Sequence, residues 1–188
     1  MGTAMILSSW STTNIEDVAK ASNGGLKWFQ LYVYRDKALT RELIYRAERG
    51  GYKALVLTVD TPVLGRRLAD TRNRFNLPSN LSLANFTDAT VGSSLITTEH
   101  SSGLQQYTAK LIDPGLTWET LDWLRSITQL PILLKGILTA EDALEALKHD
   151  IQGIIVSNHG GRQLDGVPAT VSVVISRRQA INFTTCRC

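Results

Sequence analysis

Short apolar runs alternate with amphipathic stretches along most of this chain of 188 residues. The runs are rich in branched and aromatic residues, which is typical of strands buried on both faces of a parallel sheet. Between them, apolar residues recur at helical spacing, and Gly50-Gly51 supplies a stop for the helix predicted over residues 39–47. We expect strands over residues 4–8, 28–33, 54–59, 132–135 and 153–157.

Further helices are predicted from capping residues. Thr13 and Glu16 have the spacing of a capping box at the start of a short helix. Thr117 can cap a second helix, which Pro131 ends, and residues 139–148 form a third. The strands near residues 5, 29 and 54 follow one another at intervals of about 21 to 25 residues, and so do those near residues 132 and 153. Such an interval has room for one strand, one helix and two short loops.

This repeat of βα units is shared by two architectures. Open doubly wound sheets and closed eight-stranded barrels both use it, and periodicity alone does not separate them. No Gly-x-Gly-x-x-Gly follows the first strand, which weakens the dinucleotide-binding, doubly wound alternative. The sequence therefore predicts an α/β fold built from about five βα units.

Two segments fall outside the repeat. Residues 61–116 predict no strand and are rich in Ser, Thr and Asn, and we interpret residues 76–107 as an insertion that acts as a mobile lid. Residues 171–188 lose the pattern and match neither a βα unit nor a cap. We therefore expect a body over residues 1–170 and a divergent tail over residues 171–188.

Charge and composition exclude several classes of function. The chain carries 20 Lys and Arg against 17 Asp and Glu, a net charge of +3, but the tail holds three arginines and no acidic residue. The body is therefore neutral and gives no evidence of a nucleic-acid surface. No apolar run reaches the roughly 18 residues of a membrane helix, and residues 1–10 lack the basic flank and cleavage pattern expected of a secretory signal. Both cysteines lie in the tail, which fits a reducing compartment, and no metal site is expected.

Polar side chains follow the predicted strands at their carboxyl ends, where parallel barrels carry their reactive groups. Each costs about 1 to 3 kcal/mol if buried without a partner, so their presence after all five strands indicates a polar ligand. Singly, each has an ordinary explanation: Lys135 fits a strand-end lysine and His159 fits a turn histidine. The residues are Ser8, Ser9, Trp10, Gln30, Tyr32, Tyr34, Thr58, Asp60, Lys135, Ser157, Asn158, His159 and Arg162.

Several segments together resemble the FMN-dependent 2-hydroxyacid oxidases, the family that includes glycolate oxidase. The most specific is Ser157-Asn-His-Gly-Gly-Arg-Gln-Leu-Asp165, and the resemblance runs from residue 1 to Thr170. It implies a TIM-barrel fold, here incomplete, with FMN at the carboxyl ends of the strands. The other segments are Leu7-Ser-Ser-Trp10, Phe29-Gln-Leu-Tyr-Val-Tyr34, Thr58-Val-Asp-Thr-Pro62, Leu64-Gly-Arg-Arg67, Arg72-Asn-Arg-Phe75 and Leu134-Lys-Gly136.

The resemblance implies a set of cofactor-binding residues. Ser8, Gln30, Thr58 and Lys135 would contact the flavin ring, and Ser157 would lie close to it. Lys135 would lie by N1 of the ring, where a positive charge stabilises the negative charge of reduced flavin.

The resemblance also implies the reacting groups. His159 would be the base that removes a proton from the substrate, and Asp60 would hold its ring and stabilise the imidazolium. Arg67 and Arg162 would bind the substrate carboxylate, because a guanidinium forms two parallel charge-assisted bonds. Tyr32 would donate to the substrate oxygen.

The implied substrate is a short 2-hydroxy acid such as glycolate or lactate. Trp10 would wall the pocket and, with Tyr32, leave little room for longer acids. The insertion after Arg67 corresponds to the family's mobile loop over the site. The implied reaction is oxidation of the acid to the 2-oxo acid, with molecular oxygen as acceptor and hydrogen peroxide as its product.

Two alternatives stay open. The family's first strand and its last two strands, which carry the phosphate grip, are not recognised, so a non-catalytic fragment is one alternative. The other is a barrel lyase in which Lys135 forms a Schiff base. The family also implies a homo-oligomer and a peroxisomal address. However, Cys186-Arg-Cys188 is not a Ser-Lys-Leu type signal, which leaves a cytoplasmic address open.

Overall fold

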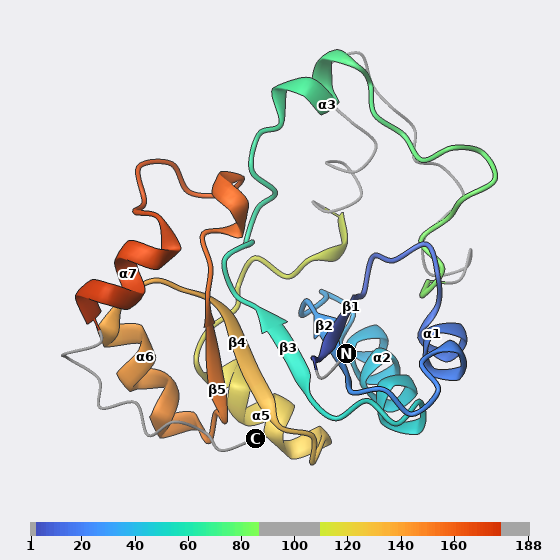
Figure 1. Ribbon diagram of the computed structural model, residues 1–188, viewed down its shortest axis with the longest axis horizontal. Helices are drawn as coiled ribbons and strands as arrows, with labels where there is room; N and C mark the ends of the chain where they lie inside the picture. The colour runs from blue at the N-terminus through green and yellow to red at the C-terminus, as the bar shows by residue number, and fades with distance from the viewer. Residues whose placement is uncertain (1–2, 87–109, 178–188) are drawn as a thin grey trace.

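Five parallel strands form one sheet whose order follows the chain, β1-β2-β3-β4-β5 (Figure 1). The computed structural model describes residues 3–86 and 110–177. A doubly wound sheet reverses its strand order partway across, whereas a barrel adds each strand beside the previous one. The observed order is therefore of the barrel type. It decides between the two architectures that the sequence left open. The strands are β1 Met5–Ser8, β2 Lys27–Leu31, β3 Leu55–Thr58, β4 Ile132–Ile137 and β5 Gly153–Val156.

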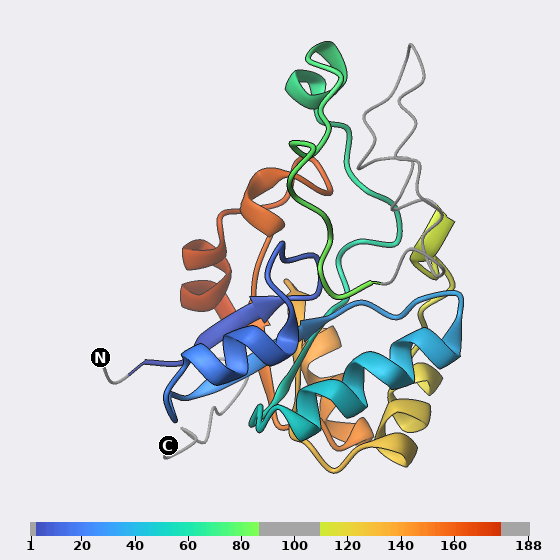
Figure 2. The same ribbon diagram turned by 90° about the vertical axis from the view of Figure 1, so that its right-hand side faces the viewer.

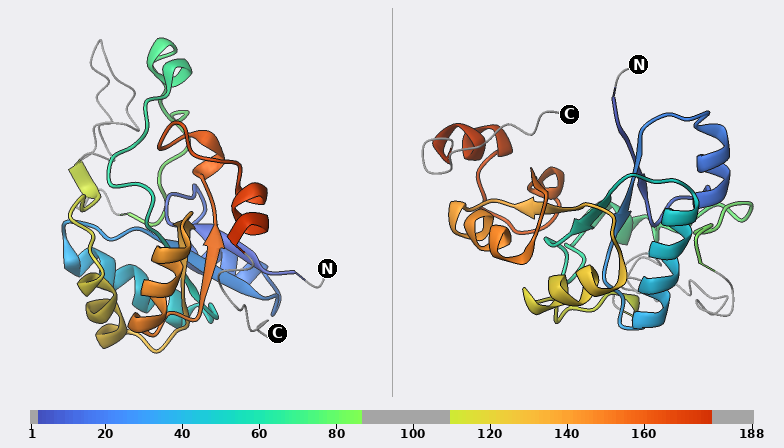
Figure 3. Two further views of the ribbon diagram at one scale, coloured as in Figure 1. Left: turned by 90° about the vertical axis from the view of Figure 1, so that its left-hand side faces the viewer. Right: turned by 90° about the horizontal axis from the view of Figure 1, so that it is seen from below.

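Helices follow the strands and lie in an arc around the sheet (Figures 2 and 3). The longest, α2, fully buries Leu43, Ile44 and Ala47 and ends at Gly50, and Gly51 takes the predicted left-handed conformation with a φ of +70°. Over the described ranges, no helix has the length and apolar character that a membrane span needs. The helices are α1 Ile15–Ala21, α2 Lys37–Arg49, α3 Leu68–Arg72, α5 Glu119–Ile127, α6 Ala140–Ala146 and α7 Thr170–Arg177, with 3-10 turns η1 Leu147–His149 and η2 His159–Gly161.

The sheet has two chemically different faces. Side chains alternate along a strand, and residues paired on neighbouring strands share a face. Ser8 pairs with Gln30, and Thr58 pairs with Lys135, each one position away from a core residue on its own strand. The face away from the core therefore carries a row of polar side chains at the carboxyl ends of the strands. The apolar core includes Leu7, Phe29, Leu31, Leu55, Leu57, Ile132 and Leu134.

Two predicted helix caps were wrong, although the elements themselves lie close to their predicted positions. Asn14, not Thr13, caps α1, because its Oδ1 accepts a hydrogen bond from Asp17 N at 2.7 Å. Thr117 does not cap α5, because the N-cap position is Trp118, which makes no side-chain capping hydrogen bond. Thr139 caps α6 as predicted.

The expectation that residues 171–188 match neither a βα unit nor a cap was wrong for the first part of this segment. Residues 170–177 form α7, which packs against β5, so this last strand has a helical partner. The branched residues that obscured the helical pattern include Val173, which is buried. Most of the predicted insertion and the remainder of the predicted tail lie outside the described residues. At the start of that insertion, Asn85 is buried and bonds Ser9 O and Ile15 N at 3.0 and 2.9 Å.

Candidate functional site

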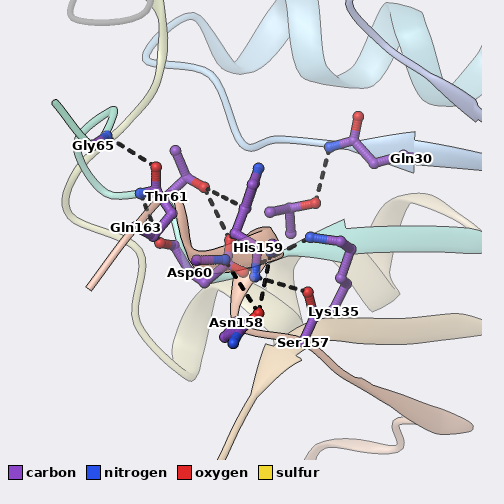
Figure 4. A network of polar contacts seen from close by, with 12 residues as sticks. Gln30, Asp60, Thr61, Gly65, Lys135, Ser157, Asn158, His159 and Gln163 are labelled. Atoms are coloured by element: carbon purple, nitrogen blue, oxygen red, sulfur yellow. Dashed lines mark hydrogen bonds and ion pairs between the residues drawn. The ribbon is translucent and has the colours of Figure 1, made fainter. Parts of the chain in front are cut away.

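A charged group that we call the Asp60 cluster, made of Asp60, Thr61, Lys135 and His159, lies at the carboxyl ends of β3, β4 and β5 (Figure 4). His159 Nδ1 lies 2.7 Å from Asp60 Oδ1, and Thr61 Oγ1 donates to the same oxygen at 2.9 Å. Lys135 Nζ lies 3.7 Å from the other oxygen, Asp60 Oδ2. That oxygen is buried and has no hydrogen-bond partner among the described residues. The cluster therefore holds one unused acceptor beside two basic side chains.

The electrostatics of the cluster fix the protonation of Asp60. Burial raises the pKa of Asp60, but the hydrogen bond from His159 and the charge of Lys135 outweigh burial, so its pKa lies below the usual value. Asp60 is therefore a carboxylate at neutral pH and only accepts hydrogen bonds. The proton of a neutral His159 ring accordingly belongs on Nδ1, which leaves Nε2 as the basic nitrogen.

The backbone around His159 is held in an uncommon conformation. His159 has a φ of +57°, in the left-handed region. This conformation is energetically unfavourable for any residue that has a side chain. Its N–H donates to Ser157 Oγ at 3.0 Å. Asn158 Oδ1 accepts from Gly160 N and Gly161 N at 3.1 and 3.3 Å. Short-range hydrogen bonds thus stabilise the turn that directs the imidazole toward Asp60.

A second, neutral group that we call the Gln30 cluster, made of Ser8, Ser9, Gln30, Tyr34 and Thr58, lies at the ends of β1, β2 and β3. Gln30 Oε1 accepts from Ser9 N, Ser9 Oγ and Ser8 Oγ at 3.2 to 3.4 Å. Gln30 Nε2 donates to Thr58 Oγ1 at 3.0 Å. Tyr34 OH donates to Ser9 Oγ at 3.1 Å and is itself fully buried. Hydrogen bonds therefore close this cluster on itself.

Two aromatic rings and two arginines lie around the clusters. The ring centroids of Trp10 and Tyr32 are 4.9 Å apart, and Trp10 Nε1 donates to the Tyr34 hydroxyl at 3.1 Å. Burial raises the pKa of Tyr32 to about 12, while the positive charges of Arg67 and Arg162 act in the opposite direction. Both guanidinium groups are therefore close enough to act on the Tyr32 hydroxyl. Arg67 Nε is buried without a hydrogen-bond partner among the described residues.

The structure groups the predicted site residues unevenly. It brings Asp60, Lys135 and His159 into mutual contact, and it brings Ser8, Gln30 and Thr58 into the other cluster. Ser157 uses its hydroxyl on the His159 backbone. Trp10 pairs with Tyr32, whereas Arg67 and Arg162 make no hydrogen bond to either cluster within the described part of the chain and act on Tyr32 through their charges.

Three residues that organise the site, Thr61, Asn158 and Gln163, had no individual role assigned from the sequence, although Asn158 was among the strand-end polar residues. Thr61 follows Asp60 directly, and Asn158 precedes His159, so adjacency was a usable signal for both. Gln163 bonds the loop after β3, about a hundred positions earlier in the chain, and nothing in the sequence pattern indicates that contact.

Two cavities flank the strand ends. A cavity of about 130 Å³ is lined partly by Tyr32, Thr58 and Thr61, next to both clusters. A larger one, of about 420 Å³, is lined mainly by apolar residues such as Trp118 and Leu121, and it includes no member of either cluster. Polar ligand chemistry therefore points to the smaller cavity.

Comparison with known proteins relates this chain to a family. A model of the family described as FMN-dependent dehydrogenase matches residues 1–185. The 2-hydroxyacid oxidase 1 of Homo sapiens is 54% identical over 177 residues, covering 93% of this chain and 47% of the relative. The glycolate oxidase of Spinacia oleracea is 54% identical over 170 residues, covering 90% of this chain and 45% of the relative. The chain thus spans about half the length of the curated relatives it matches.

Solved structures agree with the sequence comparison. A crystal structure of mandelate oxidase with (S)-4-hydroxymandelic acid superposes with a TM-score of 0.87 at 41% identity, covering 97% of this chain and 50% of that chain. Another crystal structure of mandelate oxidase gives a TM-score of 0.82 at 39% identity, with 97% and 48% covered. The five-stranded sheet of this chain therefore corresponds to about half of such an oxidase structure.

Proposed function

Because this chain belongs to the FMN-dependent dehydrogenase family, we propose that its strand-end site serves the oxidation of a short 2-hydroxy acid to the 2-oxo acid. The substrate loses two electrons and two protons, and molecular oxygen accepts both to give hydrogen peroxide. The observation that carries the proposal is the Asp60 cluster, in which a carboxylate holds an imidazole at 2.7 Å beside a lysine at 3.7 Å. A base, its orienting group and a positive charge thus share one end of the sheet.

We propose that Ser8, Gln30, Thr58 and Lys135 hold FMN, with Ser157 near it. These residues fit a flat, polar ring, because the first four share the face of the sheet away from the core. Lys135 also has capacity to donate, since 3.7 Å from Asp60 Oδ2 is too long for a hydrogen bond. When bound, FMN supplies a two-electron acceptor whose reduced form a nearby positive charge stabilises.

His159 is the base of the proposed reaction. Asp60 occupies its Nδ1, so Nε2 is the nitrogen that takes the substrate proton. The imidazolium formed in this step then lies 2.7 Å from a carboxylate, which stabilises the new charge. The low pKa of Asp60 keeps that carboxylate ionised throughout.

Arg67, Arg162, Tyr32 and Trp10 bind the substrate in this proposal. Two guanidinium groups that act on the same phenol suit a ligand with a carboxylate beside a hydroxyl, since arginine binds carboxylates in bidentate fashion. The raised pKa of Tyr32 keeps its hydroxyl protonated and able to donate. The Trp10 and Tyr32 rings, which lie tilted against each other, limit the length of the acid, which favours glycolate or lactate.

The test of the proposed function is anaerobic reduction of bound flavin. The 188-residue chain is mixed with FMN, and glycolate or lactate is added while the visible absorbance of the flavin is followed. We expect the absorbance to bleach and to return when oxygen is admitted, with hydrogen peroxide formed. A chain that binds no FMN, or whose bound FMN is not bleached by either acid, would support the non-catalytic alternative.

Two histidine variants sharpen that test. His159→Gln should abolish bleaching while FMN still binds, because the base is lost and the residues proposed to hold the ring are unchanged. His149→Gln is the matched control, since His149 also contacts a carboxylate, Asp122 at 3.0 Å, but lies on η1 away from the strand ends. Borohydride trapping of a keto acid on Lys135 would instead support the Schiff-base alternative.

We also propose, from the family relationship, that the protein forms a homo-oligomer and resides in peroxisomes. Light scattering on the purified protein tests the first statement, and microscopy of the fluorescently labelled protein tests the second. A monomer, or a uniform cytoplasmic signal, would contradict the respective statement.

A further inference from the structure

The side chain of Gln163 spans the loop that follows β3. Its Nε2 donates to the carbonyl oxygens of Asp60 and Val63 at 3.0 and 2.8 Å, and its Oε1 accepts from Gly65 N at 2.9 Å (Figure 4). Both amide protons and the carbonyl of this side chain are thereby used on one loop. Gln163 itself stands on the loop after β5, two residues beyond η2.

These two loops carry the groups that must meet in the proposed reaction. Asp60 and Arg67 lie on the loop between β3 and α3. His159 and Arg162 lie on the loop that follows β5. The contact of 2.7 Å between Asp60 and His159 exists only when the two loops keep their present separation. A shift of about 1 Å in such a pair is enough to weaken catalysis substantially.

The packing between the loops shows how closely this separation is set. A Cβ at Gly65 would lie 2.0 Å from the carbonyl oxygen of Arg162, so the two backbones touch at this point. Around it Pro62, Val63 and Arg66 are exposed, whereas Leu64 is buried. Hydrogen bonds and the burial of Leu64 therefore together fix this part of the loop.

We propose that Gln163 is a positioning residue that fixes the Asp60 carboxylate against the His159 imidazole. Its bond to the Asp60 carbonyl holds the peptide from which the carboxylate projects. Its bond to Gly65 N holds the chain two residues before Arg67. The importance of this for catalysis rests on the proposed function, whereas the positioning itself can be measured without FMN or substrate.

The chain offers a matched control in Gln152. This glutamine also makes three hydrogen bonds: it accepts from Ile132 N at 2.8 Å and donates to the carbonyl and the carboxylate of Asp150 at 2.6 and 3.0 Å. It lies at the opposite, amino end of β4 and β5. Gln163→Ala and Gln152→Ala therefore remove the same group at the two ends of the sheet.

The experiment is nuclear magnetic resonance on the full chain without cofactor. Proton–nitrogen correlation spectra of the histidine rings through two-bond couplings report which nitrogen of His159 carries the proton. They are recorded at a pH at which the rings are neutral. We expect the Nδ1–H form in the unmodified chain, a several-fold rise of the Nε2–H form in Gln163→Ala, and no change in Gln152→Ala. Hydrogen exchange of the Gly65 amide should become about fivefold to tenfold faster in Gln163→Ala only, as loss of one hydrogen bond predicts.

A second variant keeps the proposal testable if Gln163→Ala does not fold. Gln163→Glu retains an acceptor for Gly65 N but cannot donate to the two carbonyls, so it should preserve Gly65 protection and still disturb the His159 ring. The proposal is overturned if the His159 tautomer is the same in all variants, or if Gln152→Ala changes it as much. Failure of flavin bleaching would leave this result unaffected.

Discussion

The two polar clusters at the carboxyl end of the sheet differ in charge and in how completely their hydrogen-bonding groups are paired. The Gln30 cluster carries no charge at neutral pH, because burial raises the pKa of its one ionisable side chain, Tyr34, and hydrogen bonds join its members to one another and to Trp10. The Asp60 cluster contains three ionisable side chains, and one buried carboxylate oxygen has no hydrogen bond among the described residues. A closed neutral network rigidifies a structure, whereas an unsatisfied charged one is suited to a ligand.

Because of this difference, the polar strand-end residues that the sequence analysis treated as one group have different roles. Gln30, Ser8 and Thr58 first hold the ends of three strands together, and they can bind a flavin ring only with the hydrogen-bonding capacity that remains. Lys135 and His159 keep most of their capacity for molecules from outside the chain. Substitutions in the first cluster should therefore affect stability, and those in the second should affect chemistry.

The largest effect is expected for Asp60→Asn, measured as the rate of flavin bleaching by glycolate under the conditions described above. Loss of the carboxylate removes the orientation and charge stabilisation of His159, and we expect the rate to fall about 10³-fold, within the usual range for acid–base catalysis. Unchanged rates in Asp60→Asn would show that the pair has no part in proton transfer.

Asp122→Asn is the control for this variant. Asp122 also contacts a histidine, His149, at 3.0 Å, but on an exposed surface of α5. Pairs of this kind contribute little, about 0 to 1 kcal/mol, and we expect rate and stability to stay near those of the unmodified chain.

The next largest effect is expected for Gln30→Leu, measured as the free energy of unfolding in urea. The substitution leaves the buried Thr58 hydroxyl without its partner and removes the bonds of the Gln30 amide to Ser8 and Ser9. Ser9 keeps two other bonds, from its N–H to the Gln30 backbone carbonyl and from Tyr34 OH to its hydroxyl, both at 3.1 Å. We expect a loss of about 3 kcal/mol, since an orphaned buried group costs about 1 to 3 kcal/mol and each lost hydrogen bond about 0.5 to 1.5 kcal/mol. Gln129→Leu, at an exposed position in the loop before the amino end of β4, is the control, and an equal loss there would contradict the assignment.

The sequence predicted the parts of this molecule that depend on local pattern. All five strands and the order of the βα units follow from apolar runs and helical spacing, because burial on both faces leaves a clear signal. The helix α7 was missed because its branched residues favour a strand by propensity, and packing of Val173 near β5 overrides that preference. Tertiary contacts of this kind are invisible in a single sequence.

For the candidate site, the sequence identified side chains that the structure brings together better than it identified the contacts that hold them. His159, Asp60 and Lys135 could be predicted because polar residues at strand ends need a partner or a ligand. The division into two clusters could not, since it depends on which side chains reach across neighbouring strands. The Gln163 contacts could not either, because they join loops separated by about a hundred residues.

A smaller effect is expected for Tyr34→Phe. The Tyr34 hydroxyl accepts from Trp10 Nε1 and donates to Ser9 Oγ, both at 3.1 Å, so its removal costs two hydrogen bonds but leaves the ring in place. We expect the free energy of unfolding to fall by about 1 to 2 kcal/mol. Tyr45→Phe, at a position with 41% of its surface exposed, should leave it unchanged. If both variants had the same stability, the Gln30 cluster would not be a stabilising network.

The smallest effect is expected for Asp60→Asn on the dependence of the free energy of unfolding on pH. The pKa of Asp60 is lower in the folded chain than its ordinary value of 3.8, so the unfolded chain binds protons more readily as the pH falls. The contribution of Asp60 to stability is therefore fully present above its ordinary pKa and is lost as the pH falls through the folded value. Urea unfolding at a series of acidic pH values should show a shallower decline in Asp60→Asn than in the unmodified chain.

Part of the decline should remain in that variant. Glu16 and Asp113 also have lowered pKa values, through hydrogen bonds from Arg46 and Lys37, and both continue to titrate. The exposed Asp165 offers the comparison: Asp165→Asn should follow the unmodified chain. If Asp60→Asn and Asp165→Asn declined with the same slope, the charge of Asp60 would contribute nothing to folding, and the contrast between a neutral framework and a charged site would lose its electrostatic basis.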